Sequence, residues 1–211
     1  MGGWSPDGRS ITFTVFPSLA HGDHRSHLYV IPASGGVPRR VGLNWYALTD
    51  PIWASDGQSL FAIFQQQQAT DIGSLGRINL SDGRFTQLVP EADDPHLAQD
   101  GQQLYFIQRK TGLFRIPVRG GNPESLLVEP DLYWLTVNSN LSMLYFYKLS
   151  SYARHERWKL IRFDPTSRAL DTIAEVSTRP NIGHVSCDGK FLYFSQSEEY
   201  RTRLVRVSGL N

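Results

Sequence analysis

The sequence predicts an all-β fold, a β-propeller of four-stranded antiparallel blades, with about five blades in its 211 residues. Three observations support this prediction. A sequence unit recurs about every 45 residues, each unit holds short strand-like runs bounded by turn residues, and no stretch has the period of an amphipathic helix. Four strands in a unit of this length are typical of a propeller blade.

The most regular feature of each unit is an Asp-Gly pair followed by an apolar and aromatic run. The pair stands at Asp7, Asp56, Asp100 and Asp188, and Asn140 begins a degenerate copy. Successive anchors are 49, 44, 40 and 48 residues apart. Asp-Gly favours tight turns because glycine adopts positive φ without strain. Each anchor is therefore predicted to join the first two strands of a blade.

The second half of each unit repeats as well. Four of the five units contain a strand of the form Leu-x-Arg-apolar, and the first unit has Val30 in place of the arginine. A glycine-rich turn and a short β-prone strand follow in most units. Runs such as 144–147 are apolar on both faces, as expected for a strand covered by sheets on both sides. The approximate units are 1–43, 44–90, 91–130, 131–176 and 177–211, within a single propeller segment.

The ends of the chain bear on how the propeller closes. Only six residues precede Asp7, and Asn211 follows directly on the third strand of the last unit. An open blade would expose an unpaired strand edge. We therefore expect part of a six- to eight-bladed ring, in which an N-terminal segment of a longer chain supplies the missing outer strand. A self-contained five-bladed ring is the alternative.

Some of these residues carry a family resemblance. The segments 4–13, 28–32 and 34–36 resemble the WD-repeat-like (WD40-like) propeller repeat of TolB-like proteins. In their order, the segments 112–121, 133–135 and 183–196 are similar to the C-terminal propeller of bacterial regulators that carry a CadC-like winged-helix domain. The resemblance implies a sensory or protein-contact module, with DNA binding located in a domain outside this segment.

Composition excludes several classes of function. The chain has 21 Lys and Arg against 20 Asp and Glu, so it lacks the basic field of nucleic-acid-binding proteins, and no nucleic acid contact is expected. No apolar run approaches the roughly 20 residues of a membrane span. The single cysteine, Cys187, excludes an intramolecular disulfide framework and a cysteine-based zinc site. The sequence leaves the cellular compartment open.

A weak metal candidate lies in the predicted loop between the second and third strands of the first unit. Its residues are His21, Asp23, His24 and His27, whose imidazoles and carboxylate could bind zinc. A solvated loop is the favoured alternative, because no second carboxylate or HExxH motif supports the metal. We expect neither a metal nor another cofactor.

Two further histidines share one position in the repeat. His96 and His184 each stand four residues before an Asp anchor, on the predicted innermost strand. They could line the central channel as ligand or proton-sensing groups, since histidine titrates near neutral pH. The alternative is a coincidence of strand position.

No catalytic constellation is recognisable. The sequence has no Gly-x-Ser-x-Gly nucleophile elbow, and its acidic pairs do not predict facing carboxylates. We therefore predict that the chain is not an enzyme but a protein-interaction or ligand-sensing module. The alternatives are a propeller hydrolase or lyase with its site in the central channel, or the gating domain of a prolyl oligopeptidase-like peptidase.

A protein or small-ligand partner is predicted on the face that carries the long loops. Loops on a rigid scaffold carry recognition, and Trp, Tyr and Arg dominate binding hot spots. The candidate contact residues are Trp45, Tyr46, Tyr133, Trp134, Tyr152, Arg154 and Trp158. The alternative is that these aromatic side chains pack at the blade corners.

Overall fold

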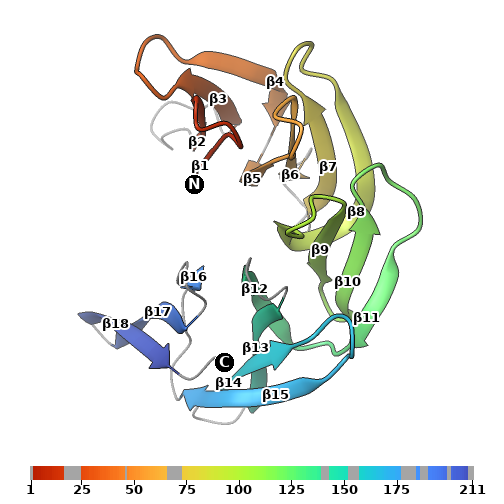
Figure 1. The fold of residues 1–211 in the computed structure, drawn as a ribbon, viewed down its shortest axis with the longest axis vertical. Helices are drawn as coiled ribbons and strands as arrows, with labels where there is room; N and C mark the ends of the chain where they lie inside the picture. The colour runs from red at the N-terminus through yellow and green to blue at the C-terminus, as the bar shows by residue number, and fades with distance from the viewer. Residues whose placement is uncertain are drawn as a thin grey trace. The chain divides into compact units, whose positions relative to one another are not determined.

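The computed structural model describes residues 2–16, 25–45, 47–65, 73–138, 143–151, 157–176, 184–185, 190–198 and 201–208. All elements in these ranges are strands, β1 to β18 (Figure 1). None of the described elements is a helix long and apolar enough to cross a membrane. The chain forms two compact units, Met1–Leu97 with Arg119–Gly121, and Ala98–Val118 with Asn122–Asn211. Each unit is described by itself.

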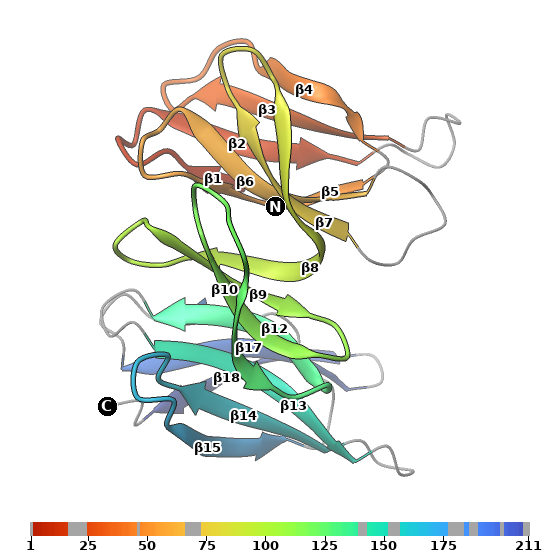
Figure 2. The same cartoon turned by 90° about the vertical axis from the view of Figure 1, so that its right-hand side faces the viewer.

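The first unit contains two blades. Blade one consists of β1 (Gly2–Trp4), β2 (Ser10–Val15), β3 (Ser26–Pro32) and β4 (Arg39–Trp45), which lie side by side in chain order (Figure 2). Blade two consists of β5 (Ala47–Trp53), β6 (Ser59–Gln65), β7 (Gly73–Asn79) and β8 (Phe85–Leu97), also in chain order. Within both blades, each strand is antiparallel to the next.

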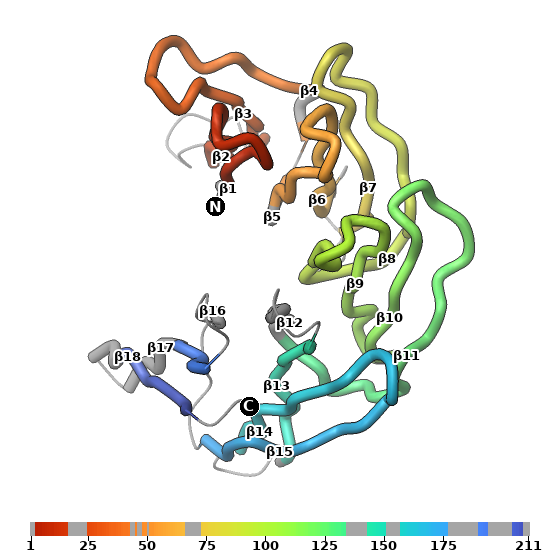
Figure 3. Tube along the Cα trace, viewed as in Figure 1, coloured from red at the N-terminus to blue at the C-terminus, as the bar shows by residue number. Residues whose placement is uncertain are grey.

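Strand β8 is the longest strand, with 13 residues, and its trace in Figure 3 continues without a loop. Within the first unit it is the last strand of the order β5-β6-β7-β8.

The second unit contains the remaining strands. Blade three has β9 (Gln103–Gln108), β10 (Gly112–Pro117) and β11 (Glu124–Val128). Blade four has β12 (Leu132–Asn138), β13 (Met143–Ser151), β14 (Arg157–Phe163) and β15 (Leu170–Val176). Among the described residues, blade five has three strands, β16 (His184–Val185), β17 (Phe191–Glu198) and β18 (Arg201–Ser208).

The Asp-Gly pairs form the predicted turns wherever the structure describes them. In three blades the aspartate Oδ1 accepts a hydrogen bond from the backbone amide two residues later, at 3.0, 2.8 and 2.8 Å for Asp7, Asp56 and Asp100. The following glycines have φ of 68°, 64° and 68°, in the left-handed region that favours glycine. The sequence motif therefore acts locally, by closing the link between the first and second strands.

The second strands of blades two and four are deeply buried. Residues 59–64 of β6 and 144–147 of β13 are all buried, as their two-sided apolar pattern predicts. In the first unit, β4 packs on blade two through the indole ring of Trp45, whose centroid lies 4.6 Å from the ring of Phe64 and 4.7 Å from that of Phe85. Side chains from consecutive blades thus share one core.

Candidate functional site

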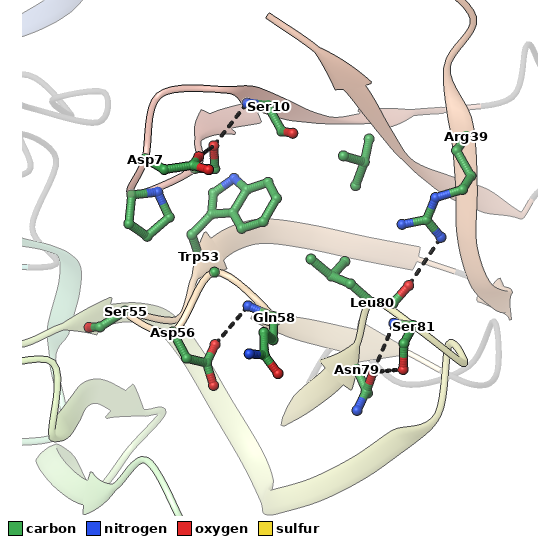
Figure 4. Close-up of a pocket in the computed structure, with 14 residues that line it drawn as sticks. Asp7, Ser10, Arg39, Trp53, Ser55, Asp56, Gln58, Asn79, Leu80 and Ser81 are labelled. Atoms are coloured by element: carbon green, nitrogen blue, oxygen red, sulfur yellow. Dashed lines mark hydrogen bonds between the residues drawn. The ribbon is translucent and has the colours of Figure 1, made fainter.

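A cleft of about 610 Å³ lies between blades one and two, at the end that carries the Asp-Gly turns (Figure 4). Both blades and their turns contribute to its lining. The residues that matter below are Ser5, Asp7, Val30, Arg39, Trp53 and Asp56.

Asp7 is held in place by its own turn. Its Oδ1 accepts hydrogen bonds from the Ser5 hydroxyl at 2.6 Å and from the Arg9 backbone amide at 3.0 Å. These two bonds, that of Ser5 first, lower the pKa of the exposed Asp7 carboxyl below its usual value. Asp7 therefore presents a fixed, ionised carboxylate at neutral pH.

The repeat shows what usually accompanies this part of a blade. In blades two, three and four, the arginine of the Leu-x-Arg strand (β7, β10 and β14) forms an ion pair with a carboxylate of its own blade. The pairs are Arg77–Asp56 at 2.9 Å, Arg115–Glu124 at 2.8 Å and Arg162–Asp171 at 3.0 Å. In blade two the acidic partner is the turn aspartate itself, so the guanidinium neutralises the position that corresponds to Asp7.

Blade one departs from this arrangement. Val30 pairs with Arg39 across β3 and β4, in the register in which Arg115 pairs with Glu124 across β10 and β11. Val30 therefore occupies the arginine position and provides no cation. Among the described residues, Asp7 forms no ion pair within 4.0 Å with a Lys or Arg side chain, although the positive charge of Arg9 also lowers its pKa.

Arg39 supplies the guanidinium of this cleft from the neighbouring strand. Its Nη1 donates a hydrogen bond of 3.0 Å to the carbonyl oxygen of Leu80, and among the described residues it has no carboxylate partner within 4.0 Å. In Figure 4, Arg39 and Asp7 lie at opposite ends of the cleft, with the indole of Trp53 between them. The cleft thus has a negative end and a positive end.

Trp53 forms a rigid surface between the two charges. Its Nε1 donates a hydrogen bond of 3.0 Å to the carbonyl oxygen of Gly3 in β1, and the side chain is 8% exposed. The indole is therefore held by both blades. Little of its face is open for stacking with a ligand.

The second unit has a smaller cleft at the corresponding place, of about 390 Å³, between blades three and four. Its guanidinium, that of Arg115, lies beside Tyr105, whose pKa is raised by burial and lowered to a lesser extent by Arg115. Glu124 binds Arg115 at 2.8 Å and also Arg168 at 3.1 Å. The guanidinium of this cleft therefore already has a carboxylate partner within the protein.

The aromatic residues predicted to contact a partner occupy strands more than loops. Trp45 ends β4, Tyr133 and Trp134 lie within β12, and Trp158 lies in β14, so their placement in long loops is corrected. Trp45 and Trp158 are buried, at 6% and 2% exposure, and the ring of Tyr133 packs edge-on against Trp158 at 5.3 Å. This agrees with the packing alternative for these side chains, while partner binding stays a prediction. Tyr46, Tyr152 and Arg154 lie outside the described residues.

The histidine candidates are only partly covered by the structure. His27 Nδ1 lies 2.7 Å from Arg40 Nη2, and because arginine can only donate, this nitrogen accepts a hydrogen bond and is occupied. His21, Asp23 and His24 lie outside the described residues, and no cluster of three potential metal ligands is found among the residues that the structure describes. His96 lies half-buried in β8, and His184 in β16 pairs with Tyr193. A ligand or proton-sensing role of these two residues stays a prediction.

Sequence reasoning did not single out Asp7 or Arg39 as binding residues. Asp7 was recognised only as a turn residue, and Arg39 only as part of a short strand. The available signal was Val30, the one departure from the repeated Leu-x-Arg strand.

Consecutive four-stranded antiparallel sheets with a repeated Asp-Gly turn define a β-propeller, and comparison with solved structures confirms this fold class. TolB from Acinetobacter baumannii matches with a TM-score of 0.73 and 17% identity, over 97% of this chain and 50% of that chain. Oligogalacturonate lyase from Vibrio parahaemolyticus matches with a TM-score of 0.71 and 12% identity, over 96% and 63% of the two chains. The β-propeller domain of the Trilobed protease from Pyrococcus furiosus matches with a TM-score of 0.69 and 15% identity, over 99% and 66%.

Sequence relatives are fewer, and no family model matches the chain. An uncharacterized protein of Agrobacterium fabrum (strain C58) is 28% identical over 131 residues, which cover 59% of this chain and 42% of the relative. The uncharacterized peptidase YuxL of Bacillus subtilis (strain 168) is 37% identical over 57 residues, which cover 27% of this chain and 8% of the relative. The chain thus spans less than half the length of either relative.

The prediction from sequence that the chain is not an enzyme is wrong. The propellers that it resembles include a lyase and a protease domain, and one sequence relative is a peptidase. The missing nucleophile elbow has no weight here, because that motif belongs to the strand-to-helix turn of an α/β-hydrolase sheet and not to a propeller blade.

Proposed function

We propose that the chain is a ligand-recognition module of the TolB-like propeller type and that the cleft between blades one and two is its binding site. The observation that carries the proposal is the pair of charges, Asp7 and Arg39, neither of which forms an ion pair within 4.0 Å with a described residue. In the second unit, by contrast, the position that corresponds to Arg39 is Glu124, which is paired with Arg115 and Arg168. A charge left without a partner beside a preformed cleft is available to a ligand.

The size of the cleft fits this role. Ligand sites usually have volumes of about 300–1,000 Å³ and a few well-placed polar groups. The cleft of about 610 Å³ lies in this range, and its main side chains are fixed before any ligand arrives. The Ser5 and Arg9 bonds orient Asp7, and the Gly3 carbonyl orients Trp53. Little conformational entropy would be lost on binding.

The test uses the repeat itself. Val30→Arg introduces into blade one the arginine that blades two to four carry, and it should pair with Asp7 and fill the cleft. We would measure the thermal stabilisation of the natural chain and of V30R by a panel of amino acids, short peptides, sugars and organic acids. We expect compounds that stabilise the natural chain to have no effect on V30R. Equal responses of both proteins to every compound would contradict the proposal.

A second candidate function is substrate recognition within a peptidase. It is favoured by the identity with the peptidase YuxL and by the structural likeness to a protease propeller. Mass spectrometry of a peptide mixture incubated with the chain would show whether cleavage occurs. If cleavage products form with the native chain and not with a heat-denatured sample, the chain itself catalyses cleavage. If the peptide mixture is unchanged, the role of the chain is limited to recognition.

We also propose that the outer edge of β18 receives a strand from the N-terminal part of a longer polypeptide. No strand is paired with this edge among the described residues, and Leu204 in β18 is 76% exposed. The amides of β18 should exchange with deuterium more slowly in a polypeptide extended upstream than in the 211-residue chain. Equal exchange in both would contradict this proposal. A regulator of the CadC-like type would carry its DNA-binding domain on the same extension.

A further inference from the structure

The ligand class can be inferred from the two ends of the cleft between blades one and two. We propose that this cleft binds a zwitterion, an amino acid or short linear peptide with a free amino group and a free carboxylate. The ammonium group binds at Asp7 and the carboxylate at Arg39. This inference rests on the proposed recognition function and specifies its ligand.

The ammonium end follows from the comparison of blades one and two. In blade two, the Arg77 guanidinium lies 2.9 Å from the Asp56 carboxylate and also donates from Nε to the Ser59 hydroxyl at 2.8 Å. In blade one, Val30 stands at the arginine position, so no guanidinium from this strand pairs with Asp7, and the charge of Arg9 acts on Asp7 without an ion pair within 4.0 Å. A ligand cation at this place would make with Asp7 the interaction that Arg77 makes with Asp56 in blade two.

The carboxylate end follows from Arg39. The guanidinium of Arg39 makes one hydrogen bond with a described residue, from Nη1 to the Leu80 carbonyl oxygen. Its remaining N–H groups are available donors, and a guanidinium matches the two oxygens of a carboxylate. The corresponding position in blade three is Glu124, whose carboxylate already binds two arginines. A ligand carboxylate at Arg39 therefore brings to blade one the charge that blade three contains.

A neutral sugar fits the cleft less well. Sugar sites rely on an open aromatic face, but Trp53 is 8% exposed and its indole is held by the Gly3 carbonyl. A purely anionic ligand would meet Asp7 and Asp56, and a purely cationic ligand would leave Arg39 uncompensated. A zwitterion satisfies both ends at once.

The experiment is calorimetric titration of the chain with alanine and with di-, tri- and tetra-alanine. The peptide whose charged ends are as far apart as Asp7 and Arg39 should bind best. For that length, we expect N-acetylation or C-terminal amidation to weaken binding about tenfold or more each, because each change removes one charge-assisted contact. Free and blocked peptides that bind equally would overturn the proposal.

Two variants test which charged group of the ligand binds at Asp7 and which binds at Arg39. Asp7→Asn retains an oxygen acceptor for the turn, so the fold should persist, and the preference for a free amino group over an acetylated one should disappear. Arg39→Gln should remove the preference for a free carboxylate over an amide. Asp100→Asn, the matched change in blade three, should leave both preferences intact. Loss of either preference in Asp100→Asn, or retention of both in the cleft variants, would overturn the proposal.

The outcomes also separate this inference from the proposed function. If no peptide binds but another compound of the panel stabilises the natural chain and not V30R, the cleft is a binding site and the zwitterion inference is wrong. If neither peptides nor panel compounds distinguish the two proteins, both proposals are wrong.

Discussion

Trp4 and Trp53 occupy the same position of the repeat but differ in burial, and this offers a direct test of how the blades are held together. Trp53 is 8% exposed and donates a hydrogen bond to the Gly3 carbonyl of the neighbouring blade, whereas Trp4 is 62% exposed. Truncation of a buried Trp to Ala usually costs about 3–5 kcal/mol, of which the hydrogen bond accounts for about 0.5–1.5 kcal/mol. An exposed residue costs about 0.5 kcal/mol or less.

We therefore expect Trp53→Ala to lower the free energy of unfolding by about 3–5 kcal/mol and Trp4→Ala by less than about 1 kcal/mol. Trp53→Phe should fall between them, since it keeps an aromatic ring but loses the indole N–H. The measurement is urea unfolding followed by far-ultraviolet circular dichroism, which does not depend on the five tryptophans as fluorescence would. Similar losses for Trp4→Ala and Trp53→Ala would refute the inference that the Trp53 contact joins the two blades.

Three further predictions concern single side chains. Thr12→Val should lower the free energy of unfolding in urea by about 1–3 kcal/mol, because the buried Thr12 hydroxyl bonds both the amide and the carbonyl of Gly3 in β1. Thr14→Val should leave it unchanged, since the Thr14 hydroxyl has no hydrogen-bond partner among the described residues. Gly112→Ala should cost more than about 3 kcal/mol or prevent folding, because φ is 143° and a Cβ would lie 2.0 Å from a β11 carbonyl oxygen; a normal melting temperature would contradict this. Ser167→Ala should raise the pKa of Asp164, because the hydrogen bond from the Ser167 hydroxyl is the largest cause of its lowered pKa. The stability that the ionised Asp164 contributes above pH 3.8 should then be lost at a higher pH as acid is added. NMR titration of Asp164 in both proteins would measure the change in pKa.

Local features of the fold could be read from the sequence. The Asp-Gly turns follow from the conformational freedom of glycine and from an aspartate that bonds its own backbone, and both act within four residues. The two-sided burial of β6 likewise follows from an unbroken apolar run. Strand boundaries were harder to predict. Strand β4 extends to Trp45 past an irregular register near Gly42, where φ is 74°, so a predicted loop residue became part of the core.

The candidate site was beyond sequence reasoning for a different reason. Its charges come from residues that are distant in sequence, and whether Asp7 can form an ion pair with β3 depends on which residue stands across from Arg39. Val30 is an unremarkable strand residue until the register of β3 and β4 is known. The missing cation then becomes apparent from comparison with Arg77 and Arg115.

The reversal of charge between Arg39 and Glu124 has a consequence for how such repeats can be rearranged. Arg39 bonds a carbonyl oxygen in the turn of the next blade, whereas Glu124, at the same repeat position, bonds the guanidinium of Arg168 in the turn of the blade after it. Exchanging the two hairpins would point a carboxylate at the Leu80 carbonyl and a guanidinium at Arg168, and both contacts would be repulsive. Although the blades share one backbone plan, they are therefore not interchangeable modules, and duplication or shuffling of single repeats would have to be followed by changes in sequence at these junctions.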